Sequence, residues 1–124
     1  MSTAGWPGRL FPRRPMASAE HARQLQQQGV IVLDVREDPE WRAGHAPGVR
    51  HIPLSRLPGL IKDLPPRRTV ITVCRSGHRS ARAAALLAGE GREAASLSGG
   101  MHAWARAGLP VVALGGHPAG WRER

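Results

Sequence analysis

Apolar segments of strand length alternate along the chain with segments in which apolar residues recur at helical spacing. Residues 30–35 and 69–73 are runs rich in β-branched side chains, and the shorter segments 49–52 and 94–97 predict two more strands. The helices that we predict cover residues 18–29, 54–64, 79–91 and 101–107, with a further short one at Asp38. Apolar strands that are separated by helices imply a parallel sheet covered on both faces.

Capping residues indicate where these helices begin and end. Ser18 is a suitable N-cap for the first helix. Asp38 is the expected N-cap of the short helix, because Pro39 would then take the first helical position. The pair Pro65-Pro66 ends the helix predicted before it.

The length of 124 residues suits one compact domain. We expect residues 16–113 to form it, because residues 1–15 and 114–124 lack hydrophobic periodicity and are typical of weakly ordered tails. No apolar run approaches the roughly 18 residues of a membrane-spanning helix, and no secretory signal is expected. The single cysteine excludes an internal disulfide, and we expect a cytoplasmic protein.

The net charge of +9 comes almost entirely from arginine, since Lys62 is the only lysine. Such a charge suits a nucleic acid, an acidic partner or a small anionic substrate. The basic residues are scattered apart from the pairs at 13–14 and 67–68, and aromatic residues are not interleaved with them. We therefore expect neither a nucleic-acid nor a membrane partner.

A short polar loop, Cys74–Ser80, joins the strand at 69–73 to the helix predicted at 79–91. In an open α/β sheet, ligands bind at the carboxyl ends of the strands, which is where Cys74 lies. The backbone N–H groups of such a loop and the N-terminus of the following helix attract an anion, and Gly77 permits a positive φ. The loop is therefore a candidate anion-binding site.

The same features bear on the chemistry of Cys74. Arg75 and Arg79 add two permanent positive charges, so loop and helix together favour a thiolate and a depressed pKa. The alternative is that Cys74 is a small buried side chain at a strand end. Arginine, glycine and arginine at offsets of one, three and five favour the reactive cysteine.

Three motifs follow one another along residues 16–113. The loop CRSGHRS at 74–80 has a cysteine, four residues and an arginine. Before it lie residues 33–41 followed by 44–49 and Ile52-Pro53, and after it lie residues 97–101, Trp104 and 108–111. Their sequence and order resemble the rhodanese family of sulfurtransferases, in its single-domain form. Family members commonly have Asn at the position of His78, a modest departure.

The resemblance implies an α/β, rhodanese-like three-layer fold, with a five-stranded parallel sheet and helices on both faces. It also implies a sulfurtransferase, in which Cys74 accepts a sulfane sulfur from thiosulfate or a persulfide and passes it to cyanide, a thiol or a partner protein. No metal or organic cofactor is implied. The expected partners are a small anionic sulfur donor and an acidic sulfur-acceptor protein.

Roles in the site follow from the loop and the resemblance. Cys74 is the expected nucleophile and persulfide carrier. The residues expected to bind the donor and stabilise the persulfide are Arg75, Ser76, Gly77, His78 and Arg79. The residues expected to support them are Asp34, Arg36 and Ser80, the last as a cap of the following helix.

Two of these assignments leave alternatives open. Arg79 either holds the donor or points into the fold and pairs with a carboxylate. Asp34 and Arg36 end a neighbouring strand and could reach the loop, although we favour a structural ion pair. Trp41 and Trp104 are expected as core anchors of the helices that carry them.

Two other functions fit parts of the pattern. A cysteine phosphatase or arsenate reductase also holds a thiolate in an anion-binding loop, but that loop has five residues between cysteine and arginine, one more than here. A non-enzymatic rhodanese-like sulfur carrier or protein-binding module is the second alternative. The presence of Cys74 and both loop arginines favours the enzyme.

Overall fold

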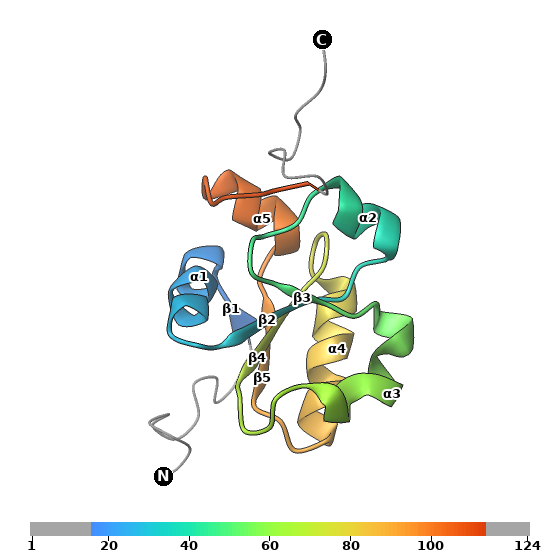
Figure 1. The fold of residues 1–124 in the computed structure, drawn as a ribbon. Helices are drawn as coiled ribbons and strands as arrows, with labels where there is room; N and C mark the ends of the chain where they lie inside the picture. Colours follow the sequence, from blue (N-terminus) through green and yellow to red (C-terminus); the bar gives the residue numbers. More distant parts are fainter. Residues whose placement is uncertain (1–15, 114–124) are drawn as a thin grey trace.

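The computed structural model describes residues 16–113, which form an α/β domain built on one parallel sheet. The sheet has five strands in the order β1-β5-β4-β2-β3 (Figure 1). Their bounds are β1 Met16–Ala17, β2 Ile31–Asp34, β3 Arg50–His51, β4 Val70–Val73 and β5 Ala94–Leu97. All neighbouring pairs are parallel, which confirms the predicted fold class.

Helices cover both faces of the sheet, as its apolar strands require (Figure 1). On one face lie α1 Ala19–Gln27 and α5 Gly100–Arg106, whose buried residues pack with Val32, Val73 and Leu97 of the strands. On the other face lie α3 Leu57–Leu60 and α4 His78–Gly89, which pack against Ile31, Leu33 and Val70. The short helix α2 Asp38–Ala43 follows β2.

Strand alternation decides which face each residue of β4 meets. Val73 belongs to the core under α1 and α5, whereas Val70 and the following Cys74 belong to the core under α4. Thr72 points to the α4 face too, because its hydroxyl donates to the carbonyl of Ser80 at 2.6 Å. Cys74 therefore leaves the sheet on the side where α4 begins.

The predicted caps are correct at one helix and wrong at another. Ser18 caps α1, and its hydroxyl accepts from the N–H of His21 at 3.1 Å. The N-cap of α2 is Glu37 rather than Asp38, because the carboxylate of Glu40 accepts from the N–H of Glu37 at 3.0 Å and completes a capping box.

The single helix predicted over residues 54–64 is wrong. The segment forms the 3₁₀ helix η1 Leu54–Arg56, then α3, then the 3₁₀ helix η2 Ile61–Asp63. Pro58 and Gly59 fall inside it, and both disfavour a continuous α-helical ladder. Leu57, Ile61 and Leu64 are nonetheless buried, as their spacing predicts.

Two further expectations need correction. Trp104 is fully buried, but Trp41 is only partly buried, and its indole stacks on the rings of His45 and His51 with centroids 4.0 and 5.0 Å away. The segment Met16–Ala17, to which we assigned no element, pairs with β5 as the edge strand β1.

The predicted tails, residues 1–15 and 114–124, lie outside the described residues. Within residues 16–113, no helix is both long and apolar enough to cross a bilayer.

Candidate active site

The candidate site lies where β4 ends and α4 begins, at the carboxyl edge of the sheet (Figure 1). On one side of β4 is β2, with Asp34 in register with Val73, and on the other side is β5. Loops that follow the central strands of a parallel sheet meet at this edge, which is where such folds bind ligands.

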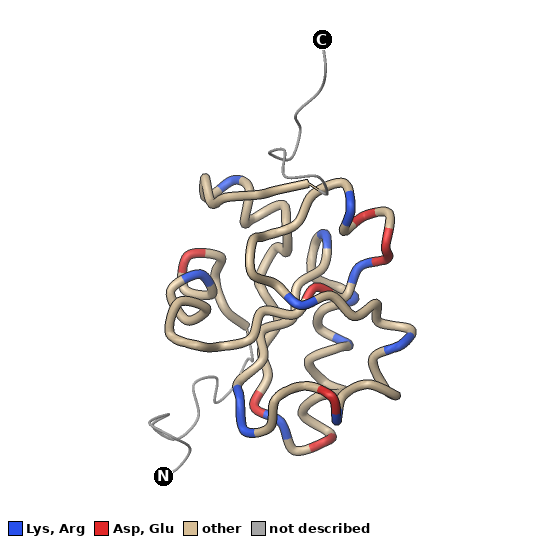
Figure 2. The backbone as a smooth tube through the Cα atoms, viewed as in Figure 1, with Lys and Arg blue, Asp and Glu red and all other residues tan. Residues whose placement is uncertain are grey.

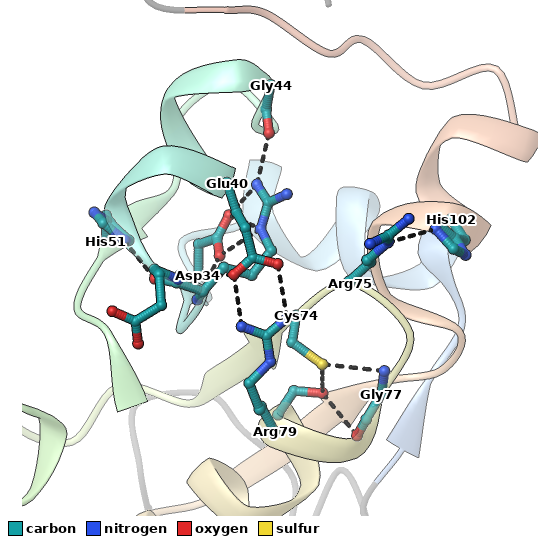
Figure 3. A network of polar contacts seen from close by, with 12 residues as sticks. Asp34, Glu40, Gly44, His51, Cys74, Arg75, Gly77, Arg79 and His102 are labelled. Carbon is teal, nitrogen blue, oxygen red and sulfur yellow. Dashed lines mark hydrogen bonds and ion pairs between the residues drawn. The ribbon is translucent and has the colours of Figure 1, made fainter. Parts of the chain in front are cut away.

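The loop bends back so that its backbone faces the sulfur of Cys74. The N–H of Gly77 donates to Sγ at 3.0 Å, and Gly77 has a φ of 131°, in a region that other residues rarely adopt (Figure 3). Gly77 is also the N-cap of α4. The predicted loop around the sulfur is therefore present, and glycine permits its geometry.

Cys74 is 1% exposed, and its environment favours the ionised form. Burial would raise the pKa of the thiol, but the hydroxyl of Ser80 outweighs it together with backbone N–H groups of the loop, so the pKa lies below the ordinary thiol value. The backbone donors belong to Ser80, Gly77 and Ser76. The sequence prediction of a depressed pKa agrees in direction, and hydrogen bonds supply most of the effect.

Ser80 lies beside the sulfur and does not cap α4. Its hydroxyl oxygen is 3.5 Å from Sγ of Cys74, 3.1 Å from the carbonyl oxygen of Gly77 and 2.7 Å from the hydroxyl of Ser96. The capping prediction is wrong because α4 begins earlier, at His78, which places Ser80 inside the first turn with its side chain on the buried face.

Arg79 takes the second of its two open alternatives and pairs with a carboxylate. Its guanidinium donates to both oxygens of Glu40, at 2.6 and 2.9 Å (Figure 3). The pair holds the pKa of Glu40 down at about 2, chiefly through the hydrogen bond from Arg79. It ties the start of α4 to α2, so the charge of Arg79 is largely balanced before any anion binds.

Asp34 and Arg36 form the structural ion pair that we favoured. Both residues are buried, and the guanidinium of Arg36 donates to both carboxylate oxygens of Asp34, with a shortest distance of 2.8 Å. Arg36 also donates to the carbonyl of Gly44 at 2.6 Å, while its own carbonyl contacts the ring of His51 at 2.8 Å. The pair braces the segment after β2, and among the described residues no hydrogen bond joins it to Cys74.

The remaining loop side chains face outward. Ser76 and His78 are exposed, and the backbone N–H of Ser76 is one of the donors that lower the pKa of Cys74. Arg75 is exposed as well, and its Nε donates to Nε2 of His102 at 3.3 Å (Figure 3). Arg75 has no carboxylate within ion-pair distance among residues 16–113. It is therefore the loop cation available to an anionic ligand.

The first turn of α5 is hydrogen-bonded to the backbone of the loop that begins at Cys74. The N–H of Met101 donates to the carbonyl of Cys74 at 2.8 Å, and the N–H of His102 donates to that of Arg75 at 3.2 Å. A Cβ at Gly100 would overlap the carbonyl of Cys74 and lie 2.6 Å from that of Arg75. Glycine at this position is what lets α5 approach so closely.

Sequence reasoning missed four residues of the site: Glu40, Ser96, Gly100 and His102. Glu40 lies in the first of the three motifs and Gly100 in the last. Neither motif shows which residue the side chain of Glu40 contacts, or why position 100 needs a glycine. Ser96 has a weak signal of its own, as a polar residue inside the buried strand Ala94–Leu97. Nothing in the sequence pairs His102 with Arg75.

This geometry defines a class: an α/β protein that stabilises a cysteine thiolate inside a loop of N–H donors at the carboxyl edge of a parallel sheet. Comparison of the sequence with known proteins identifies the family. Residues 18–107 match the profile of the Rhodanese-like domain family, and the chain belongs to that family of sulfurtransferases.

Relatives agree over most of the domain. A sulfurtransferase of Allochromatium vinosum is 37% identical over 92 residues, which cover 73% of this chain and 86% of the relative. The thiosulfate sulfurtransferase GlpE of Pseudomonas fluorescens is 36% identical over 86 residues, covering 68% and 79%. The crystal structure of a rhodanese-related protein from Thermoplasma volcanium has a TM-score of 0.74 at 31% identity, covering 81% of this chain and 98% of that one.

Proposed function

We propose that this protein is a rhodanese-type sulfurtransferase that moves a sulfane sulfur from an anionic donor to a thiophilic acceptor through a persulfide on Cys74. The observation that carries the proposal is the loop around the sulfur, in which Gly77 N–H donates to Sγ at 3.0 Å and the hydroxyl of Ser80 lies 3.5 Å away. Donors of this kind favour the thiolate of Cys74, and the thiolate is the nucleophilic form of cysteine.

In the first half of the reaction, the thiolate of Cys74 attacks the outer sulfur of the donor. With thiosulfate, a new S–S bond forms on Cys74, the S–S bond of the donor breaks, and sulfite leaves with the bonding electrons. The charge then resides on the outer sulfur of the persulfide. Loop N–H groups that are already oriented stabilise this charge without reorganisation.

In the second half, a nucleophilic acceptor attacks the outer sulfur. Cyanide, a thiol or a cysteine of a partner protein would serve. The bond between acceptor and sulfur forms, the S–S bond to Cys74 breaks, and its electrons return to Sγ as a thiolate. The same donors that activated Cys74 thus stabilise it as the leaving group.

The two loop arginines have different roles in the proposed reaction. Arg79 braces the loop through Glu40, whereas exposed Arg75 is the residue that we assign to the anionic donor. Asp34, Arg36 and Glu40 keep the surrounding loops in place. For the larger partner we propose an acidic acceptor protein, and for the compartment a reducing cytoplasm, which would keep the single cysteine as a thiol.

The direct test is intact mass spectrometry after brief incubation with thiosulfate, run in parallel on the wild type and Cys74→Ser. The wild type is expected to gain one sulfur atom and to lose it again on addition of cyanide. Because the chain has one cysteine, a gain on the wild type alone assigns the sulfur to Cys74.

The same experiment is repeated with glutathione persulfide as a second donor. Absence of the sulfur adduct with both donors would contradict the proposal and leave a non-enzymatic binding module with this fold. Turnover of an aryl phosphate at a rate comparable to sulfur transfer would contradict it in favour of a phosphatase.

A further inference from the structure

Three hydroxyl groups lie in the otherwise apolar layer between the sheet and α4. They belong to Thr72 on β4, Ser80 on α4 and Ser96 on β5, which are 0%, 0% and 4% exposed. The hydroxyls of Ser80 and Ser96 are 2.7 Å apart, and that of Ser80 is 3.5 Å from the sulfur of Cys74. These contacts connect Ser96 to the sulfur through a single intervening hydroxyl.

Counting hydrogens fixes the direction of these bonds when Cys74 is ionised. The thiolate has no hydrogen, so Ser80 must donate its only hydroxyl hydrogen to stabilise the sulfur. The short contact between Ser80 and Ser96 then needs the hydrogen of Ser96, with the oxygen of Ser80 accepting it. In the neutral thiol, by contrast, Ser80 is free to donate to the carbonyl of Gly77, 3.1 Å away.

We propose that Ser96 is a positioning residue, whose hydroxyl donates to Ser80 so that Ser80 donates to the ionised sulfur of Cys74. The donation from Ser96 holds the Ser80 hydroxyl in the orientation that the thiolate needs, and it polarises that hydroxyl into a stronger donor. Among the described residues no hydrogen bond joins Ser96 to the sulfur, so in this proposal Ser96 acts through Ser80.

These two successive hydrogen bonds, from Ser96 to Ser80 and from Ser80 to the sulfur, form a relay. The relay acts on Sγ and not on the outer sulfur of a persulfide. It therefore serves each half of the proposed reaction, stabilising the nucleophile in the first and the leaving group in the second. That part of the inference rests on the proposed function. The effect on the resting cysteine does not, and ionisation of the unloaded protein tests it separately.

The composition of the chain makes this ionisation directly measurable. Cys74 is the only cysteine, and the chain has no tyrosine, whose phenolate would overlap the ultraviolet absorbance of a thiolate. A pH titration of that absorbance on the full chain therefore reports Cys74 alone. Ser96→Ala is expected to move the midpoint upward by about 0.3–0.5 pH units, and Ser80→Ala by about 1–2 units.

A double-mutant cycle tests whether Ser96 acts through Ser80. In the Ser80→Ala background, adding Ser96→Ala is expected to cause no further shift, since the connecting hydroxyl is already absent. Ser96→Thr keeps the hydroxyl on a β-branched side chain that suits a strand, and it is expected to restore the midpoint of the wild type.

Thr72→Val is the matched control for simple damage to the layer. Thr72 is equally buried and also contacts Ser80, but it donates to the backbone carbonyl, at 2.6 Å, and not to the hydroxyl. We expect Thr72→Val to lower the unfolding temperature without moving the thiolate midpoint. A comparable midpoint shift in Thr72→Val would indicate a general packing effect and overturn the proposal.

Two other results would also overturn it: an unchanged midpoint in Ser96→Ala, or equal shifts from Ser96→Ala in the presence and absence of Ser80. For the transfer itself, Ser96→Ala is expected to slow release of sulfur from preformed persulfide to cyanide about twofold to threefold. If no persulfide forms in any variant, the proposed function fails while the titration still decides the relay.

Discussion

The carboxylate of Glu40 binds two partners from different parts of the chain. One of its oxygens accepts from the N–H of Glu37, which caps α2, and both oxygens accept from Arg79 at the start of α4. The side chain of Glu40 therefore stabilises the N-terminus of α2 and connects α2 to the active-site loop. Loss of Glu40 should affect both the helix and the loop.

We predict that Glu40→Gln lowers the free energy of unfolding at pH 7 by about 1 kcal/mol, a modest value because both partners are about one-third exposed. The pKa of Glu40 is about 2 in the folded protein and 4.5 ordinarily, so the stabilisation is complete above pH 4.5 and is lost as the pH falls towards 2. Urea unfolding of wild type and variant across this range measures the difference.

The control for this prediction is Glu90→Gln, which changes an exposed carboxylate at the end of α4. We expect it to have little effect at any pH. A gap between wild type and Glu40→Gln that stays constant down to pH 2 would rule out the ion pair as the cause.

At the scale of residues, contiguity decided what the sequence could predict. The loop that surrounds the sulfur is contiguous in sequence, from Cys74 through Gly77 to the start of α4. A local pattern was therefore enough to predict a loop of N–H donors around the sulfur. Glu40 lies 39 positions from Arg79, and Ser96 lies 16 from Ser80, so only the fold brings them together. The sequence suggested a carboxylate partner for Arg79 but could not say which one.

At the scale of elements, the segment between β3 and β4 replaces one expected helix with three short ones. Short helices leave many carbonyl groups without an intrahelical partner. Arg92, just before β5, donates to three carbonyls at the end of this segment, those of Ile61, Leu64 and Pro65, at 2.7–3.1 Å, and the carbonyl of Ile61 also accepts from the N–H of Leu64. One side chain thus ties the end of the segment to the sheet.

We predict that Arg92→Ala lowers the free energy of unfolding by about 2–3 kcal/mol, because three part-buried hydrogen bonds from a charged donor are lost. Denaturant unfolding measures this loss. The control is Arg82→Ala, an exposed arginine on α4 with no such contacts among the described residues, for which we expect a change within about 0.5 kcal/mol. Equal losses in the two variants would show that removal of positive charge, and not of these bonds, is responsible.

Elements were predicted well where their own sequence carries enough signal. The strands β2, β4 and β5 stand out as apolar runs, and Leu57, Ile61 and Leu64 keep helical spacing although their segment is divided into three short helices. The edge strand β1 has only two residues, too few for any periodicity, and it exists because β5 offers a free edge. Its pairing is tertiary information that the segment itself does not contain.

At the scale of the whole molecule, the excess of arginine is dispersed. Lys and Arg positions are spread along the described part of the chain, with Asp and Glu positions among them (Figure 2). The net charge of +9 nevertheless produces a long-range positive potential. Close to the sulfur, Arg79 is balanced by Glu40, so Arg75 contributes most of the local charge that an approaching anion meets.

These charges lead to a prediction about the acceptor. If it is an acidic protein, transfer from preformed Cys74 persulfide should slow about tenfold as salt rises from low to above physiological concentration, because screening shortens the range of attraction to under about 10 Å. Loading the protein first removes the donor, whose own charge would otherwise add a salt dependence. Stopped-flow or quenched mass spectrometry gives the transfer rate.

A small neutral thiol is the reference acceptor, since attraction by the net charge contributes little to its encounter with the protein. Arg75→Gln should weaken the salt dependence seen with the protein acceptor more than Arg82→Gln does, because Arg75 lies in the loop beside the sulfur and Arg82 is exposed further along α4. If an acidic protein and the neutral thiol show the same salt dependence, the positive charge does not select the acceptor. Recognition would then have to depend on short-range contacts around the exposed loop.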